Sequence, residues 1–122
     1  MRNMSFSMTT EAVRNRTKTV TRRLGWAFLK PGDLLMACEK CQGLKKGEKV
    51  KRLGVIRVVS VEKETLHDLF HYDLTATQYE MEREGFDGWT PWGFVDMFIT
   101  ANHCSEHTPL NRIEFEYVDG ED

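Results

Sequence analysis

One long segment of strand-forming residues, RLGVIRVVSVEK at positions 52–63, limits the folds open to this chain. Within it, Val55, Arg57 and Val59 alternate with Ile56, Val58 and Ser60. β-Branched residues favour extended backbone, and apolar residues in both phases of the alternation indicate a strand that is buried on much of both faces. Such a strand needs partner strands beside it and other layers above and below it. The sequence therefore predicts a domain built on a sheet.

Other segments supply the partner strands. LLMAC at 34–38 follows the turn signal KPGD at 30–33 and is typical of a buried strand. NRIEFEYV at 111–118 alternates apolar with charged residues, which predicts a half-buried strand. The threonine-rich TKTVT at 17–21 also favours extended backbone, because its residues are mostly β-branched. GLKKGEK at 43–49 is expected to be a hairpin connection.

Helices are predicted in three places. A short one begins near Thr9 or Thr10, either of which can cap TEAVRNR. Helical spacing of apolar residues extends over 65–85, in two segments. A further helix has Thr90 as N-cap and Pro91 at its first position. The order helix, strands, helices, strand is typical of a small α+β domain on a curled sheet.

The length and composition of the chain limit the kinds of protein it can be. The chain has 122 residues, 40% of them hydrophobic and 30% charged, which suits one globular domain. No apolar run approaches the roughly 20 residues of a membrane helix, and the N-terminus lacks the apolar core of a secretion signal. Three cysteines, an odd number, argue for a reducing compartment. We therefore expect a soluble cytoplasmic domain with no membrane partner; its oligomeric state is left open.

The segment RNRTKTVTRRLGW at 14–26 concentrates positive charge in a chain whose net charge is −2. It holds Arg14, Arg16, Lys18, Arg22 and Arg23, and no acidic residue occurs from position 12 to 32. An anionic partner must be met by such a local patch, because the molecule as a whole has almost no net field. The alternative is an ordinary solvated basic face.

Four motifs in order, TKTVTRR, LKPGDLL, EREGF and RIEFEYV, resemble the ASCH domain, a member of the PUA-like superfamily. The chain is similar to the small single-domain ASCH proteins of phages and bacteria. The resemblance implies one domain over 1–122, with a core of about 5–118 and an acidic C-terminal tail. It also implies an α+β fold: a PUA-like curled β-barrel with flanking helices.

The resemblance further implies a cleft, lined by the basic segment, that accepts a nucleoside, a nucleotide or RNA without a cofactor. Some ASCH proteins are amidohydrolases that remove the acyl group of N4-acetylcytidine with a lysine, a threonine three residues later and a distant glutamate. Lys18 and Thr21 take the first two places, and Glu84 of EREGF takes the third. Glu80 or Glu82 are alternatives for the glutamate.

The chemistry makes definite demands on these residues. A threonine hydroxyl needs a base, so Lys18 would have to be neutral, and the nearby cations Arg16, Arg22 and Arg23 lower its pKa. Residues three apart on a flat strand point to opposite faces, so Lys18 and Thr21 converge only if a turn or bulge separates them. Arg23 is expected to face substrate. Trp26 is either a stacking platform for a base or a buried anchor.

Two other functions use the same basic cleft. One is a non-catalytic module that binds RNA or a nucleotide through Arg22 and Arg23. The other, less favoured, is a ribonuclease, for which the chain offers no obvious pair of catalytic histidines.

Three motifs have a plain structural alternative. Cys38, Cys41, Cys104 and His107 form a C-x2-C…C-x2-H set that could bind structural zinc, but free cysteines packing as small apolar residues explain it as well. His67 and His71 are four apart, as in metalloproteases, yet the glutamate of that motif is missing. The basic run at 45–52 is expected to be a solvated hairpin tip, or else an extension of a nucleic-acid track.

Overall fold

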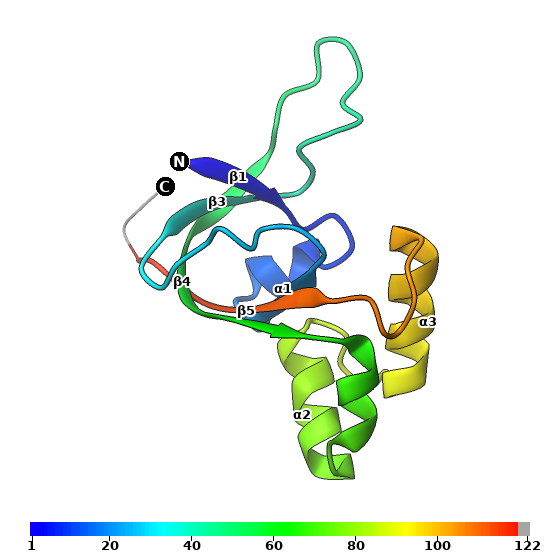
Figure 1. The fold of residues 1–122 in the computed structure, drawn as a ribbon. Helices are drawn as coiled ribbons and strands as arrows, with labels where there is room; N and C mark the ends of the chain where they lie inside the picture. The colour runs from blue at the N-terminus through cyan, green and yellow to red at the C-terminus, as the bar shows by residue number, and fades with distance from the viewer. Residues whose placement is uncertain (120–122) are drawn as a thin grey trace.

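The computed structural model describes residues 1–119, which form one curled sheet with helices packed around it (Figure 1). The strands are β1 (Arg2–Ser5), β2 (Val20–Arg23), β3 (Leu34–Cys38), β4 (Arg52–Glu64) and β5 (Leu110–Tyr117). The helices are α1 (Thr10–Arg14), the 3₁₀ helix η1 (Leu66–His71), α2 (Leu74–Arg83) and α3 (Pro91–Asn102). The last residues of the predicted acidic tail, 120–122, lie outside the described part of the chain.

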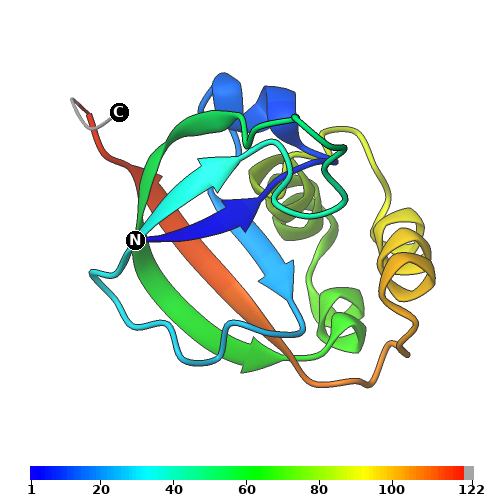
Figure 2. The same ribbon diagram turned by 90° about the horizontal axis from the view of Figure 1, so that it is seen from above.

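The five strands form a half-barrel with the order β1-β3-β4-β5-β2, in which β1 runs parallel to β3 and every other pair is antiparallel. The long strand β4 pairs with β3 in its first half and with β5 from Ile56 to its end. A register shift between Val58 and Ser60 marks a bulge, which increases local twist. Seen from above, the strands curl around a common interior (Figure 2). The predicted α+β architecture, a curled sheet with flanking helices, is confirmed.

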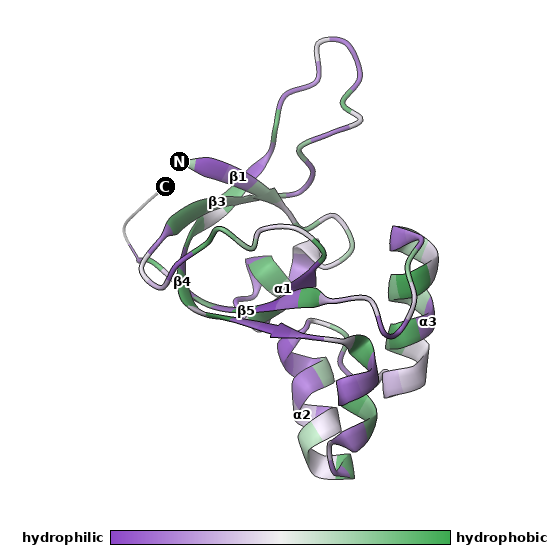
Figure 3. Cartoon of the chain, in the orientation of Figure 1, coloured by the Kyte–Doolittle hydropathy of each residue, from purple (hydrophilic) through white to green (hydrophobic). Residues whose placement is uncertain are grey.

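Three apolar clusters hold the fold together. The interior of the half-barrel is filled mainly by buried side chains from the sheet, including Met4, Phe6, Ile56 and Phe115. A second cluster joins η1, α2 and α3 to the start of β5. The third is small and lies where the segment 39–51 covers Met36, Cys38 and Val55. That segment projects away from the helices and carries mostly hydrophilic residues (Figures 1 and 3).

The third cluster corrects the prediction for the long strand. Val55 and Ile56 are both buried, so both faces are covered there, but Arg57 and Val59 are exposed. The segment 39–51 covers only the first half of the outer face. Beyond that point, β4 is buried on one face.

Two strand predictions also need correction. β1 was not predicted, although Met4 and Phe6 alternate with polar residues, and its first residues lie outside the range of about 5–118 expected for the core. The predicted strand at 17–21 is Val20–Arg23 instead. Arg16 adopts a left-handed conformation with φ of 60°, and the amides of Thr17 and Lys18 both donate to the carbonyl of Ala12. These residues complete the end of α1, so they cannot pair in the sheet.

The predicted helices are confirmed with two changes. The short helix α1 has Thr9 as its N-cap, but the Thr9 side chain makes no capping hydrogen bond. The Thr90 hydroxyl accepts a hydrogen bond from the Gly93 amide at 3.1 Å, with Pro91 at the first position of α3. The region 65–85 is helical, but its first part is the 3₁₀ helix η1, which a Thr65–Asp68 capping box begins. Among the described residues, no helix is long and apolar enough to cross a membrane.

Gly85 lets the end of α2 approach α1 closely. Its φ is +89°, and a Cβ atom there would lie 3.1 Å from both the Ala12 Cβ and the Thr9 Cγ2. Both the conformation and the space therefore favour glycine. The close approach places Glu84, the preceding residue, beside the turn that carries Lys18.

Candidate active site

A buried lysine lies at the centre of the candidate site. Lys18 lies in the turn between α1 and β2 and is 2% exposed. Its backbone is fixed, because the Tyr117 hydroxyl donates to its carbonyl at 2.6 Å and its amide donates to Ala12. Its Nζ donates to the carbonyl of Glu84 and, at 3.0 Å, to Oε1 of the Glu84 carboxylate. The ammonium is thus held at the end of α2 rather than in solvent.

Glu84 links this lysine to a buried arginine. Its other carboxylate oxygen, Oε2, accepts from Nη1 of Arg22 at 2.9 Å. Arg22 donates to two more carboxylates, through Nε to Glu64 at 2.5 Å and through Nη2 to Glu80 at 2.5 Å. Glu80 in turn accepts from Nε of Arg112 at 2.6 Å. The result is a buried charge network in which three carboxylates surround one guanidinium.

This geometry distinguishes among the three glutamates that the sequence offers for the third site residue. Glu84 is 2% exposed and is the carboxylate that contacts Lys18. Glu80 is buried as well, but its partners are arginines. Glu82 is exposed. Of the three, Glu84 lies beside Lys18, as the motif EREGF indicated.

The network sets protonation states. Burial lowers the pKa of Lys18, the arginines Arg22 and Arg23 add to that effect, and Glu84 opposes it without cancelling it. Burial acts in the same direction on Arg22, yet its surrounding carboxylates outweigh it and raise the pKa of the guanidinium. Burial by itself raises the pKa of Glu80, but Arg112 and Arg22 outweigh it and lower that pKa to about 2. Of the network's cations Lys18, Arg22 and Arg112, Lys18 is therefore the one whose pKa is lowered.

Thr21 faces the same cavity as Lys18. The cavity has a volume of about 270 Å³, and Lys18, Thr21, Arg22, Arg23 and Glu84 all line it. Both side chains reach this cavity although they are three residues apart, because Lys18 precedes the strand, in the turn, whereas Thr21 lies within β2. The Thr21 hydroxyl accepts a hydrogen bond from Nε of Arg23 at 3.0 Å. Its own proton is available to a base.

The rest of the cavity wall is mostly apolar. Phe6, Phe86, Phe94, Met97 and Phe98 contribute to it. The Lys18 Nζ lies 5.8 Å from the centre of the Phe86 ring and 6.0 Å from that of Phe6. The sequence interpretation did not identify these residues as the wall of a cavity. They belong to the apolar clusters of the core or pack against them, so their sequence pattern is that of core residues. A cavity that combines aromatic walls with a few charged groups suits a flat polar ring.

A second hollow of about 380 Å³ adjoins the first and shares Arg22, Arg23 and Asn102 with it. Trp26 lines this second hollow rather than the Lys18 cavity. Its ring centre lies 5.6 Å from that of Phe28, and it is partly buried against the half-barrel interior. Arg23 closes the open side of the sheet, since its Nη2 donates to the carbonyl of Ser5 on β1 at 2.6 Å.

Arg16 lies elsewhere. It lines neither hollow, and it forms an ion pair with Asp119 and lies over the Tyr117 ring at 5.5 Å. The basic segment is therefore divided: Lys18, Arg22 and Arg23 face the cavities, whereas Arg16 contacts the end of β5.

The structure does not bring the four proposed zinc ligands together. Cys38 and Cys41 belong to the small cluster under the segment 39–51, whereas Cys104 packs against the helical cluster. Within residues 1–119, the group of potential metal ligands that does come together includes His107 but no cysteine. The spacing in the sequence was suggestive, but the two pairs belong to opposite ends of the sheet.

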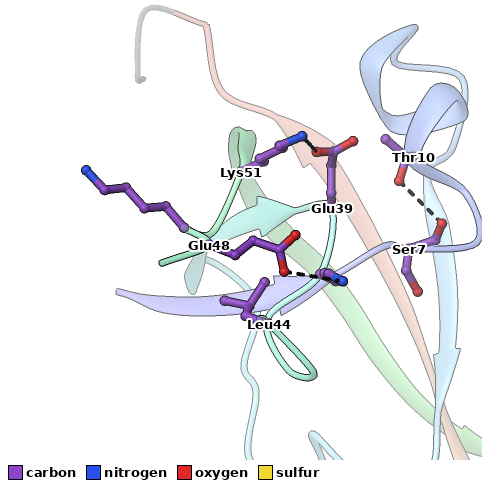
Figure 4. Close-up of a pocket in the computed structure, with 8 residues that line it drawn as sticks. Ser7, Thr10, Glu39, Leu44, Glu48 and Lys51 are labelled. Carbon is purple, nitrogen blue, oxygen red and sulfur yellow. Dashed lines mark hydrogen bonds and ion pairs between the residues drawn. The ribbon is translucent and has the colours of Figure 1, made fainter. Parts of the chain in front are cut away.

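The basic run at 45–52 lies beside a different cavity, of about 220 Å³, under the segment 39–51 (Figure 4). Acidic residues of the same segment offset its charge. Lys51 lies 3.9 Å from Glu39, and Lys40 lies 3.6 Å from Glu48. This cavity shares Ser7 with the Lys18 cavity, and no lysine or arginine of the basic run lines the Lys18 cavity.

The chain has the fold of an ASCH domain. The chain is similar to the ASCH domain from Lactobacillus crispatus JV V101, with a TM-score of 0.60 and 14% identity over 95% of this chain and 78% of that one. It is similar to protein EF3133 from Enterococcus faecalis V583, of the DUF984 family model, with a TM-score of 0.60 and 15% identity over 97% and 76% of the two chains. No family model and no curated protein matches the sequence.

Proposed function

We propose that the protein acts on a nucleoside or RNA base, and that it is an amidohydrolase that removes the acyl group from N4-acylated cytidine or a related modified base. The observation that carries the proposal is the burial of Lys18, in contact with Glu84, at an aromatic cavity that Thr21 also lines. Placing these charges out of water costs stability, which a purely structural role does not require. The ASCH resemblance supplies the substrate class.

The reaction assigns one role to each side chain. Neutral Lys18 has two N–H groups, both of which Glu84 can accept, and this leaves the amine lone pair free to take the proton of the Thr21 hydroxyl. The Thr21 oxygen then attacks the acyl carbonyl, and the protonated lysine returns the proton to the departing N4 amine. Arg23, which already donates to Thr21, stabilises the negative oxygen of the intermediate. Water activated by Lys18 finally hydrolyses the acyl ester.

Substrate placement follows from the two adjoining hollows. The cytosine ring suits the aromatic walls of the Lys18 cavity, where base–aromatic stacking is tolerant of exact base identity. The sugar then extends toward the second hollow, which Arg2 and Arg23 line. A phosphate or an RNA strand would continue past these arginines, so the proposal covers both a free nucleoside and a base within RNA.

The test is chromatography of N4-acetylcytidine after incubation with the purified protein at several pH values. We expect cytidine and acetate as products. Because the base must be neutral, kcat/KM should rise with pH and level off below the ordinary lysine value of 10.5, since the pKa of Lys18 is lowered. A rate that falls as pH rises over neutral to alkaline values would contradict Lys18 as the base.

A non-catalytic RNA-binding module is the second candidate, and the second hollow favours it. Arg2 lies over the exposed Phe28 ring at 4.7 Å, and Trp26 stands beside that ring. Cations interleaved with aromatic rings are the usual surface for single-stranded nucleic acid. If no product forms, RNA binding that weakens with salt and with Arg2→Ala would identify this role.

A further inference from the structure

We infer that His67, His107 and Glu106 form a binding site for a divalent transition metal ion such as Zn²⁺, separate from the Lys18 cavity. One potential ligand atom from each lies within 4.8 Å of the other two. His67 lies in η1, and the other two lie in the loop between α3 and β5. None of the three lines the Lys18 cavity.

The distances fit a tetrahedral ion. Oε1 of Glu106 lies 3.4 Å from Nδ1 of His67 and 3.3 Å from Nε2 of His107. Ligand atoms held about 2.0–2.2 Å from a tetrahedral zinc ion are about 3.4 Å apart. Two edges of the ligand triangle therefore have the required length already. The third edge, between the histidines, closes by a small rotation of the exposed His107 ring.

An independent observation points to a ligand at this position. Nδ1 of His67 is buried and, alone among the buried side-chain nitrogen and oxygen atoms of residues 1–119, has no hydrogen-bond partner. The nearby Glu106 oxygen does not satisfy it, since no hydrogen bond of acceptable geometry joins them. Buried polar atoms of this kind are rare and call for an explanation. A metal ion between the ring and the carboxylate would satisfy both.

Backbone hydrogen bonds fix η1 and the loop between α3 and β5 relative to each other. The His67 amide donates to the Glu106 carbonyl at 3.0 Å, and the loop is closed by the Thr108 amide donating to Ser105 at 3.2 Å. The Ser105 hydroxyl also accepts from the His107 amide at 3.2 Å. The ligand-bearing positions are thus fixed before any ion arrives.

The donor set indicates the class of metal. Two imidazoles and one carboxylate suit zinc and its neighbours better than Mg²⁺ or Ca²⁺, which prefer oxygen ligands. Water can supply the fourth ligand of a tetrahedral ion. An ion here would join η1 to the loop that leads into β5.

The test is Zn²⁺ titration calorimetry of the full chain without a polyhistidine tag. We expect one ion per chain, with at least about 10-fold weaker binding for His107→Ala and for Glu106→Gln, because losing even an outer partner of a metal ligand costs 10–100-fold. His103→Asn is the matched control. It removes an exposed histidine of the same loop outside the cluster, and asparagine tolerates its left-handed conformation with φ of 51°. The control should bind as the wild type does.

Visible absorption spectroscopy with Co²⁺ distinguishes metal binding at this site from metal binding by the cysteines. Co²⁺ bound to nitrogen and oxygen gives visible absorption without the thiolate charge-transfer band that Cys38 and Cys41 would produce. Absence of saturable Zn²⁺ binding, a thiolate band, or equal affinity in the wild type and His107→Ala would each overturn the inference. Because His107 is the most exposed of the three ligands, its replacement leaves folding intact, and a thermal unfolding curve without metal checks this.

Discussion

Glu84→Ala is expected to lower the free energy of unfolding by about 3–5 kcal/mol, the usual effect of removing one partner from a buried ion pair. The carboxylate serves both Lys18 and Arg22, at 3.0 Å and 2.9 Å. Without it, Lys18 keeps only a backbone carbonyl, and Arg22 keeps only its other two carboxylates. Urea denaturation at neutral pH measures the change.

Glu82→Ala is the matched control for this experiment. Glu82 lies on the same helix two residues away and is exposed, so its removal should change the stability by no more than about 0.5 kcal/mol. If the two variants have similar stability, Glu84 does not organise the buried charges, and the description of the site is wrong.

Lys18→Met should reduce turnover of N4-acetylcytidine by about 10²–10⁴-fold, the usual contribution of a general base. Stability should change far less than in Glu84→Ala. Methionine fills similar space, and Glu84 remains paired with Arg22, so no buried charge is left alone. The two measurements together separate a chemical role of Lys18 from a structural one.

Lys30→Met controls for the loss of a positive charge near the basic segment. Lys30 is exposed and lines neither hollow, so kcat/KM should be unchanged. Turnover by Lys18→Met at the wild-type rate would rule out the lysine as the base, even if the substrate is the right one.

Much of the sheet could be predicted because its strands carry their own signals. β3 follows a turn motif, and β5 alternates charged with apolar residues from Arg112 to Tyr117. β1 carries no such signal beyond two apolar residues, and its parallel partner β3 lies some thirty residues further along the chain. A strand this short is defined by its pairing, which only the folded chain provides.

The sequence indicated individual residues of the candidate site but not the interactions that join them. The motif spacing indicated Lys18, Thr21 and Glu84, and all three line one cavity. The charge network around Arg22 was not anticipated, because Glu64 and Glu80 come from different elements and meet it only after folding. The histidine cluster was missed for the same reason. His67 was judged against His71 on its own helix, whereas its closest partners come from the loop before β5.

A nuclear magnetic resonance titration of ¹⁵N-labelled protein with cytidine tests most directly whether the Lys18 cavity receives a nucleoside base. We expect the amide signals of Lys18, Thr21 and Phe86 to shift in a saturable manner. Those of Leu44 and Glu48, which line the separate cavity of Figure 4, should not move. Shifts confined to Leu44 and Glu48, or no shift at millimolar cytidine, would contradict this expectation.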